Sequence, residues 1–124
     1  MTKLDHKNLL ANLPSKTRKQ LLVQSDGPGL VHFALHFGAI LLGAMLILLA
    51  VPGWQLLLPV QGLFIGFLFS PLHETIHRTA FRSERLNTAV AAICGFAVLI
   101  APCWFRYFHF AHHRFTHEPG RDPE

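Results

Sequence analysis

The chain has 124 residues, which is room for one domain. Hydrophobic residues make up 51% of it, charged residues only 15%, and the mean hydropathy is +0.33, a balance typical of a membrane protein. The net charge is +4, but the basic residues flank apolar runs and form no aromatic-basic recognition motif, so we expect membrane lipids and no nucleic acid as partners. Cys94 and Cys103 fit no C-x-x-C pattern and are interpreted as reduced packing residues.

Residues 1–29 are predicted to be a basic cytoplasmic segment, and residues 30–124 a membrane domain. The segment combines cations with leucines that could lie on a bilayer surface: Lys3, Lys7, Lys16, Arg18 and Lys19, with Leu4, Leu9, Leu10, Leu13, Leu21 and Leu22. No signal peptide is evident, because the first strong apolar run begins only near Leu30. Residues 26–29, Asp-Gly-Pro-Gly, are predicted to break the chain before that run.

The fold is predicted to be all-α, and two uncharged runs are predicted to cross the membrane as an antiparallel pair of helices. Leu30–Val51 is long enough, at about 1.5 Å per helical residue, to span a hydrocarbon core of about 30 Å. Residues 52–54, Pro-Gly-Trp, form a tight reversal with an aromatic side chain at interface depth. The second run, Gln55–Leu72, contains Pro59 near its beginning, where a missing N–H does least harm to a helix.

Six of the nine histidines lie in two clusters beyond these runs. Box one is residues 73–77, His-Glu-Thr-Ile-His, and box two is residues 109–117. Residues three or four apart share a face of a helix, so each box can direct imidazoles, the commonest metal ligands, at one centre. The predicted ligands are His73, His77, His109, His112, His113 and His117. The further pair His32 and His36, inside the first run, is more simply explained by hydration or by hydrogen bonds to a neighbouring helix.

The third apolar run, Leu86–Phe105, cannot cross the membrane if the two boxes bind the same metal centre. A straight helix of that length would carry box two about 30 Å away, to the opposite face. We therefore predict a re-entrant or interfacial segment with breaks at Gly95 and Pro102. This arrangement also places all 11 lysines and arginines on one side, which the positive-inside rule makes the cytoplasmic side, together with the N-terminus and both boxes. A plain third span is the alternative on hydropathy alone.

Two enzymatic hypotheses fit the boxes. In the first, a pair of iron ions activates O2 and oxidises a C–H bond of a lipid chain, chemistry that requires a metal because no side chain performs it alone. In the second, residues 73–77 are a zinc-protease H-E-x-x-H motif with Glu74 as general base. The surplus of imidazoles exceeds what one tetrahedral zinc can use, which favours the first. There Glu74 would orient a ligating ring or simply be solvated. Metal storage without catalysis is a third possibility.

The two boxes resemble the first and second histidine boxes of the membrane fatty acid desaturase family, a superfamily that also includes hydroxylases and carotenoid ketolases. The resemblance covers about residues 55–124: H-x-x-x-H at 73–77, then H-x-x-H-H at 109–113, followed by Pro119 and the tail Asp122-Pro123-Glu124. It implies an integral protein of an inner or plasma membrane. It also implies di-iron ligation by His73, His77, His109, His112 and His113, and less directly by His117.

The same resemblance implies an O2-dependent lipid desaturase that acts on an acyl chain and takes electrons from a ferredoxin or cytochrome. Family members have a third histidine box and further membrane helices, which these 124 residues lack. We therefore expect the chain to be an N-terminal fragment, or a truncated product, that binds iron weakly and is inactive alone. A related hydroxylase or ketolase activity stays open.

Overall fold

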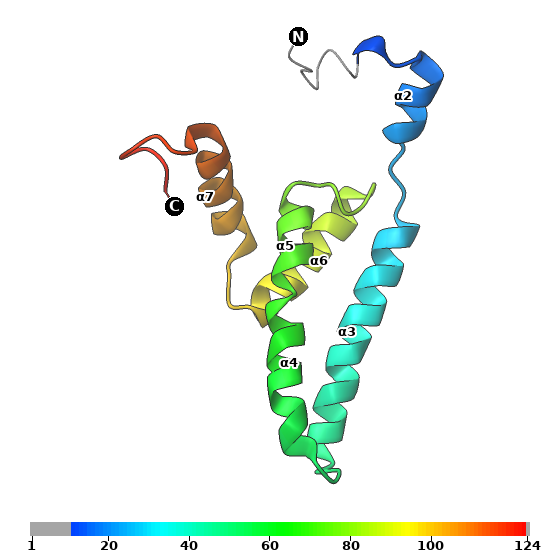
Figure 1. Cartoon of the computed structure of the whole chain (residues 1–124), viewed down its shortest axis with the longest axis vertical. Coiled ribbons are helices and arrows are strands. Elements are labelled where there is room, and N and C mark those ends of the chain that lie inside the picture. The colour runs from blue at the N-terminus through cyan, green and yellow to red at the C-terminus, as the bar shows by residue number, and fades with distance from the viewer. Residues whose placement is uncertain (1–10, 124) are drawn as a thin grey trace, which may run out of the picture.

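Helices are the only regular elements in residues 11–123, the part of the chain that the computed structural model describes (Figure 1). They are α2 (Ser15–Leu21), α3 (Gly27–Leu48), the short 3-10 helix η1 (Trp54–Leu56), α4 (Leu57–Gly66), α5 (Phe69–Ile76), α6 (Glu84–Ala97) and α7 (Pro102–Phe115). The predicted all-α class is therefore confirmed. Lys3, Lys7, Leu4, Leu9, Leu10 and Glu124, which entered the predictions above, lie outside the described residues.

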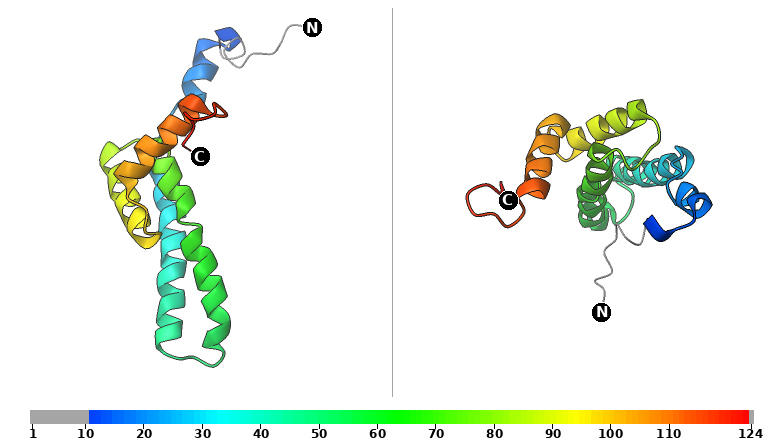
Figure 2. Two further views of the ribbon diagram at one scale, coloured as in Figure 1. Left: turned by 90° about the vertical axis from the view of Figure 1, so that its left-hand side faces the viewer. Right: turned by 90° about the horizontal axis from the view of Figure 1, so that it is seen from above.

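The two predicted spans form an antiparallel hairpin, closed by a turn in which Gly53 adopts φ 84° (Figure 2). Gly27–Leu48 and Trp54–Ile76 are each long and apolar enough to cross a membrane. The first begins at Gly27, so the prediction that residues 26–29 interrupt the chain before Leu30 was wrong by one helical turn. Asp26 is the N-cap and Pro28 lies in the first turn, where a helix does not need the missing N–H.

The second span is bent between α4 and α5, and Pro71 explains the bend. Proline has no N–H to donate to the carbonyl of Phe67, four residues earlier, and its ring crowds that carbonyl. The N–H of Ser70 donates to this oxygen instead, at 3.1 Å. The span ends at Ile76, so box one occupies its last turn and the residue that follows.

The third apolar run is broken, as predicted, by an elbow at residues 98–101. α6 and α7 meet there at 98°. α7 begins at Pro102, and Gly95 lies one turn before the elbow. A Cβ on Gly95 would lie 2.5 Å from the carbonyl oxygen of Ile100 and 2.6 Å from Cγ of Pro102. The chain can fold back this closely only because residue 95 has no side chain, and the reversal returns α7 to the end of α5 (Figure 2).

The buried side chains gather where α5, α6 and α7 meet, not along the hairpin. Leu68 and Leu72 are fully buried there, and the other buried apolar residues around them are Ile76, Phe81, Val90, Ala91, Cys94 and Phe105. α3 contributes only Ile40 to this set. Most of the hairpin surface is therefore free to face lipid, in which apolar side chains need no protein partner.

Within residues 11–123, three polar contacts join α3 and its N-cap to other segments. His36 Nε2 lies 2.8 Å from the carbonyl oxygen of Phe64, so this histidine bonds to a neighbouring helix, as the sequence suggested. Gln61 Nε2 donates to the carbonyl of Ile40 at 2.8 Å. Near the box-one end, the carboxylate of Asp26 accepts the N–H of Ser83 at 2.8 Å, and Ser83 is the N-cap of α6.

Candidate metal centre

Box one lies on α5, and its two histidines lie one turn apart on the face that meets α7. The buried side chains of Leu72, Thr75 and Ile76 occupy the rest of that helix and hold it against α6. The helix ends at His77 because Arg78 adopts a left-handed φ of 60°. Both rings are therefore held on a packed helical segment.

Box two lies on α7, which two contacts hold against α5. Arg106 Nη1 donates to the carbonyl of Ile76 at 3.1 Å, and the rings of Phe69 and Phe105 have centroids 5.2 Å apart. His109, four residues after Phe105, points the same way and is 8% exposed. His113 follows one turn later at the solvent-exposed edge. No pattern in the sequence marks Arg106 as a residue that positions box two.

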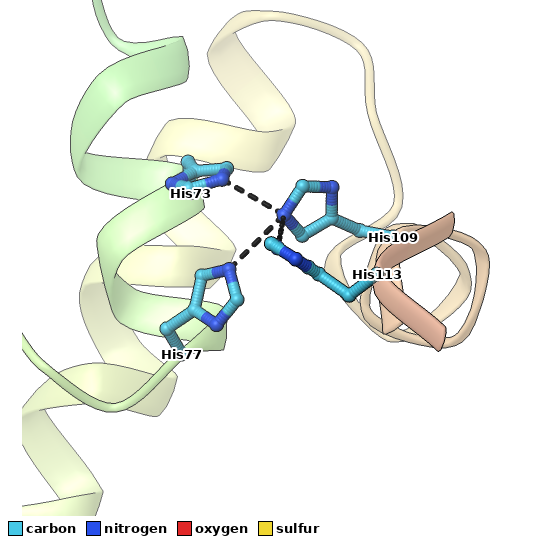
Figure 3. A group of neighbouring side chains, drawn as sticks. All are labelled: His73, His77, His109 and His113. Carbon is cyan, nitrogen blue, oxygen red and sulfur yellow. Dashed lines mark hydrogen bonds between the residues drawn. The ribbon is translucent and has the colours of Figure 1, made fainter. Parts of the chain in front are cut away.

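The structure brings four of the six predicted ligands together, two from each box (Figure 3). One nitrogen from each of His73, His77, His109 and His113 lies within 4.8 Å of the other three. His109 is at the centre: its Nε2 lies 2.8 Å from Nε2 of His73, 3.0 Å from Nε2 of His77 and 2.8 Å from Nε2 of His113. Residues that precede and follow the third apolar run in the sequence thus form one cluster.

Hydrogen bonds alone do not account for this cluster, and its spacing suits a shared cation. A ring nitrogen offers either one hydrogen or one lone pair, so Nε2 of His109 cannot bond well to three others. Two nitrogens bound at about 2.1 Å and at a right angle would lie about 3 Å apart, close to the spacings found here. Four imidazoles are a donor set for iron, zinc, copper or nickel. The residues therefore fit a metal ion.

The surroundings of His77 favour the neutral form of its ring, which is the form that binds metals. Burial lowers the pKa of His77 below its usual value, and repulsion from His73 and His113 lowers it further. Glu74, between the two ligands in sequence, points elsewhere: its Oε2 accepts the hydroxyl of Thr79 at 2.7 Å, and its Oε1 is 3.4 Å from Nδ1 of His73. The carboxylate is at most a weak orienting contact for one ring.

The two remaining predicted ligands, His112 and His117, are not among the four grouped rings. His112 Nδ1 is 2.8 Å from the carboxylate of Asp122, and the backbone N–H of His117 donates to the same carboxylate at 2.9 Å. Their predicted ligand roles stay predictions. Asp122 drew notice in the sequence only as part of the tail after box two, because its contact with His112 depends on how the loop between them folds.

The fold and the site define a helical membrane protein with a histidine cluster suited to a metal ion. The family model described as fatty acid desaturase matches residues 52–124, which include both boxes. The chain belongs to the fatty acid desaturase family. No curated protein and no solved structure gives a significant match.

Proposed function

We propose that this chain supplies the first two histidine boxes of a di-iron, O2-dependent fatty acyl desaturase. The observation that carries the proposal is the convergence of four imidazole nitrogens, two from each box, within 4.8 Å of one another. Family membership supports the same reaction class. Further ligands for a two-iron centre would come from His112 and from a third box that these 124 residues do not contain.

The residues of the chain have distinct tasks in this proposal. His73 and His77 present lone pairs from the last turn of the span, and His109 and His113 present theirs from α7. When bound, iron would supply the one-electron and O2 chemistry that side chains lack. The exposed apolar surface of the hairpin would keep the site next to lipid, and an acyl chain of that lipid would be the substrate. A ferredoxin or cytochrome would deliver electrons at the exposed edge near His113.

We further propose that the protein lies in an inner or plasma membrane, with both boxes and residues 15–21 on the cytoplasmic side. The basic residues on α2 and around the boxes support this orientation through the positive-inside rule. Hydroxylation or ketolation of a lipid or carotenoid would use the same four rings, so these residues alone do not separate those reactions from desaturation.

The zinc-protease alternative is less consistent with the geometry. Such a site needs three protein ligands, one open position and a glutamate directed at the bound water. Here four rings are grouped, one more than such a site uses, and one oxygen of Glu74 is occupied by the hydroxyl of Thr79 while the other contacts the ring of His73. The iron hypothesis therefore accounts for more of the observed contacts.

Metal analysis of chain purified without added metal tests the proposal. We expect iron, and we expect His109→Ala to remove it because His109 contacts the other three rings. His32→Ala is the matched control: it deletes a histidine of the hairpin outside the cluster and should leave the metal content unchanged. Stoichiometric zinc, together with peptide cleavage that depends on Glu74, would contradict the desaturase proposal and support the protease.

A further inference from the structure

The chain after α7 folds back on the helix in an ordered return loop, residues 116–122. The N–H of Glu118 donates to the carbonyl of Phe115 at 2.8 Å, and His117 adopts φ 64° to make the turn. The guanidinium of Arg121 lies 4.0 Å from the centroid of the Phe115 ring and donates to Glu118 at 2.7 Å. These contacts bring Asp122 alongside the last turns of α7.

Both oxygens of the Asp122 carboxylate are engaged there. Oδ2 accepts the backbone N–H of His117 at 2.9 Å, and Oδ1 lies 2.8 Å from Nδ1 of His112. The Asp122 side chain is only 11% exposed. The backbone bond fixes the carboxylate independently of His112, so the carboxylate can determine how that ring is oriented. An ionised carboxylate only accepts hydrogen bonds, so Nδ1 of His112 carries the hydrogen and the lone pair is at Nε2.

The ring of His112 lies next to the four-ring cluster. Its centroid is 6.1 Å from that of His109 and 5.9 Å from that of His113. Paired metal ions in proteins lie about 3.5–4 Å apart. The ring of His112, which is adjacent to two rings of the cluster, is therefore within reach of a second ion bound beside the first. Carboxylates that hold a ligating histidine by its other nitrogen fix its tautomer and raise its basicity.

We propose that Asp122 is a positioning residue that holds His112 with Nε2 as its metal-binding atom. The inference rests on the proposed function, because it assumes that a metal ion binds at the boxes. A purely structural role would instead make Asp122 a tether for the return loop, with no influence on the chemistry of His112.

Asp122→Asn separates these two roles. The backbone N–H of His117 still needs an oxygen to accept its hydrogen bond. The amide oxygen of the new asparagine therefore faces this N–H, and its amide nitrogen faces His112. That nitrogen donates to Nδ1, which moves the hydrogen of the ring to Nε2 and removes the lone pair there. Asp122→Glu keeps the carboxylate and should in part keep the ring hydrogen of His112 on Nδ1. Glu118→Gln is the matched control: it removes the loop's other acidic charge, its amide oxygen can still accept the hydrogen bond from Arg121, and residue 118 does not contact His112.

The first measurement is nitrogen-15 NMR of the histidine rings in the metal-free, 124-residue chain in detergent micelles. We expect the hydrogen of His112 on Nδ1 in the wild type and on Nε2 in Asp122→Asn. The second is titration with Co²⁺, followed by its visible absorption. Asp122→Asn should weaken binding by about 10–100-fold, while Glu118→Gln should not. In a His112→Ala background, Asp122→Asn should add nothing.

Three results would overturn the proposal. They are a wild-type His112 ring with its hydrogen on Nε2, a Co²⁺ affinity that does not change in Asp122→Asn, or an equal loss of Co²⁺ affinity on Asp122→Asn in the wild type and in the His112→Ala variant. Co²⁺ binding that depends on His109 but not on Asp122 would reject the positioning role and leave the four-ring centre intact. Failure of the wild type to bind Co²⁺ would reject both.

Discussion

Gly95→Ala should separate the two boxes without touching either of them. The added methyl would lie 2.5 Å from the carbonyl oxygen of Ile100, and real Cβ contacts essentially never fall below 3.0 Å. Ordinary contact begins at 3.4 Å, so the elbow must open by about 0.9 Å. The obstacle is backbone and a proline ring, which cannot rotate away as the end of a flexible side chain would. α7 must therefore move, with His109 and His113 on it.

The size of the effect follows from the tolerance of metal sites. Ligand distances in working sites hold to about 0.2 Å, several times less than this displacement. Overpacking of this kind costs about 1–3 kcal/mol. If metal binding must restore the closed elbow, that energy is taken from the binding free energy, and the affinity falls by about 5–150-fold.

Co²⁺ titration of the chain in detergent measures the change directly. Gly38→Ala is the matched control, since a Cβ at residue 38 meets nothing within 4 Å and the helix interior favours alanine. Its affinity should equal that of the wild type. Equal affinities for Gly95→Ala and the wild type would show that the close approach at the elbow does not hold the boxes together.

Two further predictions concern single histidines. His36→Ala removes the partner of the Phe64 carbonyl and should destabilise the hairpin by about 1 kcal/mol in thermal unfolding, with Co²⁺ affinity unchanged; lost affinity would make His36 a ligand. The second concerns His77, whose pKa is lowered in the folded chain. The unfolded chain binds more protons between this lowered pKa and the ordinary value of about 6.5, so metal-free stability should rise with pH across that window and level off on both sides. His77→Gln should flatten this rise of stability with pH. An unchanged slope in the variant would show that His77 does not cause it.

The histidine spacing and the hydropathy pattern together were enough to predict the fold class. A four-residue spacing places two rings on one helical face whatever surrounds the helix, which is why His73 pairs with His77 and His109 with His113. The reversal of the third run also followed from the sequence, because boxes on opposite faces of a bilayer cannot share an ion. Gly95 and Pro102 identified where that reversal occurs.

The details that the sequence did not predict have separate physical causes. Residues 26–29 looked like a break because glycine and proline disfavour a helix interior, but a first turn tolerates both. Pro71 was overlooked inside a run that reads as one span. Periodicity groups His112 with the other rings but does not reveal its partner Asp122, ten residues further on. Only the path of the return loop, which spacing does not encode, brings those two together.

The three polar contacts of α3 have a consequence for the depth of the site in the bilayer. Lipid supplies no hydrophobic force between two apolar helices, so polar contacts and close packing hold the register of the hairpin. A slip by one helical turn would move box one by about 5.4 Å along the membrane normal. The contacts that resist it are spread along the hairpin, at Asp26–Ser83, His36–Phe64 and Gln61–Ile40. A thicker or thinner bilayer would then tilt the hairpin as one body, and the histidines would keep their height relative to α3.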